Sequence, residues 1–314
     1  MRTHRPTTPT ARTVATQALS ALALSTGLLT SAQAAPDDEP AIQSYALDYE
    51  AKLLTDRRTN GLSDTFLRPG AEFTVNAAHE SGLIGYLQVG SVARANFPES
   101  KLWTAVAAAG YRWGNPQGWH YGLGLAHEMF PGAQVKDAPR NPFVDFNDTM
   151  RTRFDTGFAV IGLGYNIVEA RYLHVLSEDL RGNNTAVVCG SRFAPEFEAY
   201  LNLQADPSEA MACYGDSVKH SRGSQLLSID TRYPIAPQTK LVAHVGYTQV
   251  KNFKQVTTYD YKLGVAHTRW GLDFELDAVA ARMRDRSYAV TYDVYGHTKR
   301  IDRTALVASL AKRF

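Results

Sequence analysis

The chain has 314 residues, of which 44% are hydrophobic and 20% charged, with a formal net charge of +2 and a pI near 8.4. It contains no block of basic residues, which argues against a nucleic-acid partner. It has two cysteines and no further ligands at metal spacing, so the sequence predicts neither a metal centre nor any other cofactor.

The first 34 residues have the features of a secretory signal peptide. Arg2, Arg5 and Arg12 form a basic leader, residues 14–30 are rich in Ala and Leu, and Ala-Gln-Ala at 32–34 suits cleavage after Ala34. The alternative interpretation is a membrane-anchoring helix. We therefore assign residues 1–34 to the export signal and residues 35–314 to the fold.

The rest of the chain is dominated by segments that alternate apolar and polar residues with period two, as a strand with one apolar face requires. The clearest example is Leu272, Phe274 and Leu276, which interleave with charged residues. A soluble β-sandwich also alternates, but its turns are not sorted by length. Twelve segments fit this pattern, at residues 42–54, 68–78, 82–94, 102–114, 118–130, 154–165, 168–179, 222–233, 239–250, 257–269, 270–282 and 303–314.

The gaps between these segments are alternately long and short, which is typical of a transmembrane β-barrel with short periplasmic turns and long outer loops. The sequence therefore predicts an all-β, antiparallel, up-and-down barrel of about twelve strands in the bacterial outer membrane. Residues 181–221 form its longest outer loop, which contains Cys189 and Cys213. In an exported chain these cysteines are expected to form a disulfide, the alternative being two free thiols.

Aromatic residues cluster at one end of the predicted strands, as in the girdle that barrels place at the lipid headgroups. They are Tyr45, Trp113, Trp119, Tyr165, Tyr233, Trp270 and Phe314. The terminal Phe314 resembles the signal that outer-membrane assembly machinery reads. The expected partners are thus outer-membrane lipid, lipopolysaccharide, this assembly machinery and small hydrophilic solutes.

Strand parity assigns a set of charged residues to the inner face of the barrel, where they are candidates for lining a pore. These are Asp48, Glu50, Lys52, Arg68, Glu72, Arg112, Glu169, Arg171, Asp230, Arg232, Lys240, Lys262, Asp273, Glu275 and Asp277. Such residues fit either a water-filled pore or a salt-bridge network that closes the lumen. The acids at 273, 275 and 277 are read as a cation-attracting stripe or as partners of the neighbouring lysines.

One pair of residues has the spacing of a barrel lipid hydrolase, His79 and Ser81. Catalysis would require the two side chains in contact and a third group that orients the histidine. The pair falls in a predicted short turn before Gly82, where turn chemistry explains it. The sequence therefore predicts no catalytic residue and no enzyme.

Several stretches resemble the TorF family of porins, and the similarity covers most of the mature chain. They include TDRRTNGLSD at 55–64, RPGAEF at 68–73, SGLIGYLQVGSVA at 81–93, FPGA at 130–133 and GLDFELD at 271–277. The resemblance implies an outer-membrane barrel and carries over no substrate or catalytic residue. The expected function is passive diffusion of small hydrophilic solutes. A closed barrel that acts as a surface receptor or adhesin is the main alternative.

Overall fold

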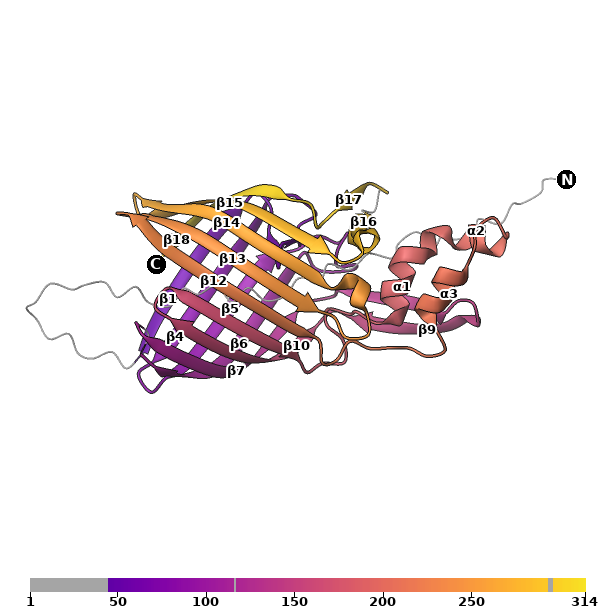
Figure 1. Cartoon of the computed structure of the whole chain (residues 1–314), viewed down its shortest axis with the longest axis horizontal. Coiled ribbons are helices and arrows are strands. Elements are labelled where there is room, and N and C mark those ends of the chain that lie inside the picture. Colours follow the sequence, from indigo (N-terminus) through magenta and orange to yellow (C-terminus); the bar gives the residue numbers. More distant parts are fainter. Residues whose placement is uncertain (1–44, 116, 293–295) are drawn as a thin grey trace, which may run out of the picture.

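The computed structural model describes residues 45–115, 117–292 and 296–314, so the predicted signal peptide lies outside the described residues. Twelve strands form one closed antiparallel barrel (Figure 1), which confirms the predicted fold class, and each predicted strand has its counterpart. In chain order these strands are β1 (Tyr45–Leu54), β4 (Gly70–His79), β5 (Leu83–Ser91), β6 (Trp103–Gly114), β7 (Trp119–Met129), β10 (Thr156–Tyr165), β11 (Val168–Val175), β12 (Gln225–Ala236), β13 (Thr239–Gln249), β14 (Thr258–Arg269), β15 (Leu272–Met283) and β18 (Ala305–Arg313).

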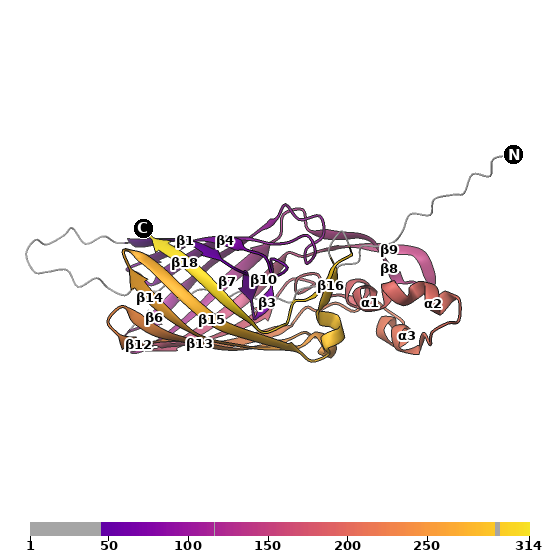
Figure 2. The same ribbon diagram turned by 90° about the horizontal axis from the view of Figure 1, so that it is seen from above.

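The two ends of the barrel differ in their connections, as Figure 2 shows. At one end, here called the turn end, connections of two to four residues join β4 to β5, β6 to β7, β10 to β11, β12 to β13 and β14 to β15. At the other, the loop end, all connections are longer. Consecutive strands pair in antiparallel register, and β18 pairs with β1 to close the ring.

The alternation in the sequence accounts for the two faces of the wall. On β1, Leu47 and Leu53 are exposed on the outside, whereas Asp48 and Lys52 point inward and are partly covered. The same pattern gives an outer surface of exposed leucine, isoleucine and valine. At the turn end this surface is bounded by exposed aromatic rings, namely Tyr45, Trp113, Trp119, Tyr165, Tyr233, Trp270 and Phe314.

The turn between β14 and β15 shows how the local sequence sets the register. Trp270 has φ of 55° and Gly271 has φ of 71°, so both central residues adopt the left-handed conformation that two-residue hairpin turns favour. The glycine adopts it without steric cost. The turn leaves Trp270 78% exposed at the edge of the barrel.

The loop end carries the remaining elements. A hairpin of β8 (Gln134–Asn141) and β9 (Asp145–Arg153) extends beyond the barrel, beside the helices of the loop at 176–224, hereafter the helical loop (Figure 1). Its helices are α1 (Thr185–Phe193), α2 (Phe197–Leu201) and α3 (Ser208–Tyr214). Asn184 caps α1 by accepting a hydrogen bond from the Val187 amide at 3.1 Å. None of the helices in the described residues is both long and apolar enough to span a bilayer.

The helical loop also contains the predicted disulfide. Cys189 of α1 and Cys213 of α3 are bonded, and the alternative of two free thiols is thereby excluded. Around the disulfide pack Phe193, Tyr200 and Tyr214, all buried. The helical loop thus has a small core of its own, separate from the barrel wall.

A larger apolar core lies at the loop end of the barrel. Phe97 and Phe130 stack with ring centroids 4.3 Å apart, and Phe154 meets Phe97 edge-on at 5.7 Å. Leu62 and Ile301 are fully buried in the same cluster, although they come from loops far apart in the sequence. Apolar packing therefore fills the loop end, whereas the lumen beyond it has charged walls on the side of β12 to β15.

Two short strand pairs and three 3-10 turns complete the loop end. β2 (Arg58–Thr59) pairs with β3 (Leu62–Ser63), and β16 (Val290–Tyr292) pairs with β17 (Thr298–Arg300). Single 3-10 turns lie at Ala194–Glu196, Lys254–Val256 and Arg286–Ala289.

Candidate functional site

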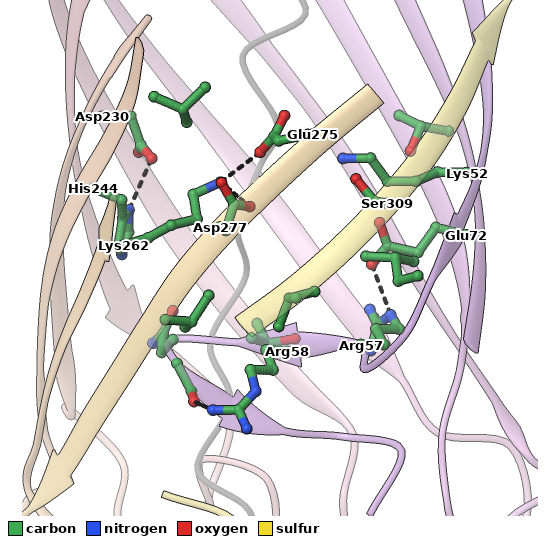
Figure 3. Close-up of a pocket in the computed structure, with 18 of the residues that line it drawn as sticks. Lys52, Arg57, Arg58, Glu72, Asp230, His244, Lys262, Glu275, Asp277 and Ser309 are labelled. Carbon is green, nitrogen blue, oxygen red and sulfur yellow. Dashed lines mark hydrogen bonds and ion pairs between the residues drawn. The ribbon is translucent and has the colours of Figure 1, made fainter. Parts of the chain in front are cut away.

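A cavity of about 180 Å³ lies inside the barrel and is lined mainly by charged side chains (Figure 3). These side chains come from β1, β4, β11 to β15 and β18, where strand parity turns them inward. The segment between β1 and β4 supplies others. Because acids and bases face one another across this cavity, its electrostatics depend on how they pair.

The side chains of β12 to β15 form a chain of ion pairs along the cavity wall. Lys262 Nζ lies 3.2 Å from Glu275 Oε1 and 3.6 Å from Asp277 Oδ2, and Arg232 Nη2 lies 3.0 Å from Glu275 Oε2. His244 bridges two acids, with Nδ1 2.8 Å from Asp230 and Nε2 2.6 Å from Asp260. Asp230 also pairs with Arg171.

The sequence left open whether the acids of β15 form a negative stripe or pair with bases, and these contacts answer that question. Glu275 and Asp277 both pair with Lys262, and Asp273 lies 3.6 Å from Arg313. The three acids are therefore held by neighbouring bases rather than forming an uncompensated negative stripe.

Residues 55–69, hereafter the inward segment, turn into the lumen and occupy its loop end. Gly61 lies against β14 and β15, since a Cβ built on it would be 2.8 Å from the Cβ atoms of Asp260 and Ala281. The Asn60 amide donates to Thr248 of β13 at 2.8 Å. The stretch 59–66 is buried except for Asn60, which is half-buried. The inward segment therefore crosses from β1 to strands on another part of the wall.

Two buried arginines fix the inward segment. Arg57 pairs with Asp64 within the segment and with Glu72 of β4, at 2.8 Å for the latter. Burial lowers the pKa of Arg57, but the nearby carboxylates outweigh it and hold the pKa above its usual value. Arg57 therefore stays charged.

Arg181 of the helical loop makes the second connection. It pairs with Glu128 of β7 and lies 3.5 Å from Asp64 of the inward segment, and its side chain has no exposed surface. Its guanidinium carbon also lies 5.0 Å from the Phe130 ring centroid. A single side chain thus ties the helical loop to the wall and to the inward segment.

The predicted lining residues fall into three groups. Lys240 and Asp273 line a smaller cavity nearer the turn end, and Arg112 and Glu169 line an apolar cavity beside β6, β7 and β10. Most of the others line the charged cavity of Figure 3, namely Asp48, Glu50, Lys52, Glu72, Arg171, Asp230, Arg232, Lys262, Glu275 and Asp277.

Arg68 departs from this pattern. The sequence predicted that Arg68 begins a strand, but β4 begins at Gly70. Arg68 is an exposed loop residue, and its guanidinium carbon lies 5.7 Å from the Phe66 ring centroid. It lines none of these three cavities. The proline at 69 lacks a backbone donor for the strand ladder, which explains why the strand starts after it.

The inward segment supplies site residues that the sequence did not indicate, notably Asp56, Arg57 and Arg58. Its composition of charged and small polar residues is also that of an exposed loop. The close spacing of opposite charges in TDRRTNGLSD could have indicated buried ion pairs, because a loop in water does not require them. His244, which bridges two acids, was not indicated by the sequence either.

His79 and Ser81 do contact each other, with Nδ1 2.8 Å from Oγ, but in an exposed turn. The Ser81 amide also donates to the same Nδ1 at 3.1 Å, so the contact belongs to the turn. Among the described residues no acid contacts the histidine. Nor does the described chain contain a group of three or more His, Cys, Asp or Glu side chains able to hold a metal ion.

A family model described as "Bacterial protein of unknown function (Gcw_chp)" matches residues 38–314. No curated protein matches the chain.

Among solved structures, the chain is similar to the KdgM porin, with 6% identity and a TM-score of 0.42 over 85% of this chain and 98% of that one. It is also similar to the COG4313 outer membrane channel from Pseudomonas putida F1, with 10% identity and a TM-score of 0.39 over 90% of this chain and all of that one. A mutant of the Rh. blastica porin has 10% identity and a TM-score of 0.31, over 78% of this chain and 55% of that one.

Proposed function

The chain belongs to the Gcw_chp family of bacterial proteins of unknown function, and we propose that it is an outer-membrane channel for passive diffusion of small hydrophilic solutes. The observation that carries this proposal is the closed barrel with an apolar outside and a charged cavity inside. A closed ring leaves no unpaired strand edge, which is the condition for placing β-structure in hydrocarbon. Aromatic rings at the turn end suit a membrane interface.

The polar lumen supports a channel because charges inside a barrel must be paired or hydrated. The pairs on β12 to β15 are incompletely satisfied, since Asp260 Oδ1 and Asp277 Oδ1 have no hydrogen-bond partner among the described residues. Water or a passing solute could supply those partners. In this proposal the ion-paired wall is the solute path.

The inward segment then acts as the constriction. It narrows the lumen at the loop end, where Arg57 and Arg181 hold it. We therefore expect the native channel to have a small conductance that rises when this segment is removed.

The test is planar-bilayer conductance of refolded protein, with and without a deletion of residues 58–64 bridged by Gly-Gly. Small discrete conductance steps in the native protein, increased several-fold by the deletion, are expected. As a control, shortening the exposed stretch at 202–204 between α2 and α3 should leave the steps unchanged. Absence of steps in both the native and the deleted protein would contradict a channel.

The second candidate function is a closed barrel that displays the helical loop as a receptor or adhesin. It is favoured by the apolar cluster that fills the loop end and by the disulfide-bonded core of the helical loop. The same conductance experiment separates the two candidates. In either case we assign no catalytic role to His79 and Ser81.

A further inference from the structure

Two arginines flank two glycines in a single cross-strand row on the inner wall. Arg112 of β6 is paired with Gly122 of β7, Gly122 with Gly162 of β10, and Gly162 with Arg171 of β11. With neighbouring strands about 4.8 Å apart, the arginine Cα atoms are separated by roughly 14 Å, with no side chain between them. We call these four residues the glycine row.

The glycine row lies on the floor of a mainly apolar cavity of about 170 Å³, to which Tyr86 and Val160 also contribute. A Cβ built on Gly162 would meet no atom within 4 Å, so the space above this glycine is open. Gly110 and Gly124 form the next inward-facing pair of β6 and β7. A Cβ at either position would lie 2.6 Å from a carbonyl oxygen of the other strand, so these glycines allow the two backbones to approach closely. The floor is therefore bare backbone rather than side chain.

Arg171 is one of the charged residues that line this cavity. Its side chain is 8% exposed, one guanidinium nitrogen pairs with Asp230, and Nε and Nη1 have no hydrogen-bond partner among the described residues. A buried donor without an acceptor is unfavourable, and an anion at the cavity edge would supply the missing acceptor. Arg171 lines both this cavity and the charged one, so it stands where the two meet.

The acids nearest the glycine row have partners of their own. Glu169 Oε1 lies 2.7 Å from His120 Nε2, and Asp48 accepts a hydrogen bond from Asn76 at 3.3 Å. His120 and Asn76 thus each occupy one oxygen of the acid that they contact. The row thus combines a glycine floor with a guanidinium group at each side.

We infer that the glycine row binds a small organic anion with a flat apolar body, of the class of aromatic carboxylates. The carboxylate pairs with Arg171 and Arg112, since guanidinium groups match carboxylates in a two-point hydrogen bond. The ring lies on the glycine floor against Tyr86 and Val160. A concave apolar surface with few polar groups is typical of small-molecule sites. This inference rests on the proposed function, because the anion reaches the row through the lumen.

The test measures binding of benzoate to the refolded barrel in detergent by titration calorimetry. Benzoate should bind at least 10-fold more tightly than either benzamide, which lacks the charge, or acetate, which lacks the ring. Gly162→Leu, which fills the open space, should weaken benzoate binding at least 10-fold. The matched control is Gly157→Leu on the outer face of the same strand, where a Cβ meets only the His127 ring at 3.7 Å, and it should bind as the native protein does.

Arg112→Gln gives an independent variant that keeps the floor, and it should weaken benzoate binding several-fold without affecting benzamide. It remains decisive if Gly162→Leu does not refold, as judged by heat-modifiable gel mobility. Equal binding of benzoate and benzamide, or native affinity in a folded Gly162→Leu barrel, would overturn the inference.

Conductance recorded on the same samples distinguishes the two proposals. Benzoate binding without conductance steps would refute the channel and leave the site standing. Conductance steps without benzoate binding would refute the site and leave the channel standing.

Discussion

Gly61 is the residue on which the position of the inward segment depends most directly. Its φ of 71° is unfavourable for other residues by roughly 1–2 kcal/mol. A Cβ there would also overlap Asp260 and Ala281. We therefore predict that Gly61→Val displaces the inward segment and raises single-channel conductance several-fold in planar bilayers.

Gly271 offers a matched control for that experiment. It has the same φ of 71°, but a Cβ built on it meets no atom within 4 Å. Gly271→Val should therefore carry the backbone strain alone and leave conductance unchanged. If the two variants behave alike, backbone strain rather than contact with the wall explains the effect, and our account of the constriction is wrong.

At the scale of an element, the disulfide is expected to stabilise the helical loop and not the barrel. Cys189 and Cys213 are 24 residues apart, and closing such a loop restricts the unfolded chain by about 3 kcal/mol. The barrel is held by its own hydrogen-bonded ring. Reductant should therefore raise protease cleavage between residues 181 and 221 while the heat-modifiable gel band persists.

The double variant Cys189→Ser/Cys213→Ser serves as the control. It should be protease-sensitive to the same degree with or without reductant. Loss of the folded gel band on reduction of the native protein would show that the helical loop supports the barrel after all.

The elements differ in how far the sequence could predict them. The barrel strands were predictable because each alternates between lipid-like and polar surroundings, as Leu47, Asp48 and Tyr49 do on β1. The inward segment was not, because Asp64 and Arg57 are buried only through their partners, and pairing across loops leaves no periodic trace. The same holds for Arg181, whose partners lie 53 and 117 positions earlier in the chain.

Only part of the candidate site could likewise be predicted from the sequence. Inward positions such as Glu275 and Lys262 follow from strand parity, and so does the disulfide partner of each cysteine, because only two cysteines exist. The glycine row does not follow from parity, since it requires the register of four strands at once. Register depends on turn geometry, which single residues such as Trp270 determine only locally.

For the whole molecule we predict weak selectivity between small cations and anions. Acids and bases alternate along the lumen, as in the pairs of Arg232 with Glu275 and Arg313 with Glu50. Reversal potentials in a potassium chloride gradient should therefore lie near zero, because Asp273, Glu275 and Asp277 are paired with bases. A strong preference for chloride would contradict the pairing described here.

We also predict that the helical loop faces the outside of the cell and the turn end faces the periplasm. The separation of long and short connections between the two ends is the basis for this orientation. Thiol labelling of intact cells should reach a cysteine introduced at Ser217, which is exposed, and spare one introduced beside Trp270. The reverse labelling pattern would overturn the orientation.

The contact between β18 and β1 has a consequence for the order in which the molecule is assembled. Its ladder pairs only Glu50–Leu54 with Ser309–Arg313, whereas β1 pairs with β4 along its whole length from Tyr45 to Leu54. Until this seam forms, the sheet has two free edges whose amides and carbonyls have no partner in hydrocarbon, each costing several kcal/mol. Strand β18 must therefore pair with β1 before the barrel can lie stably in the lipid. Membrane insertion and closure of this seam are in that sense one event.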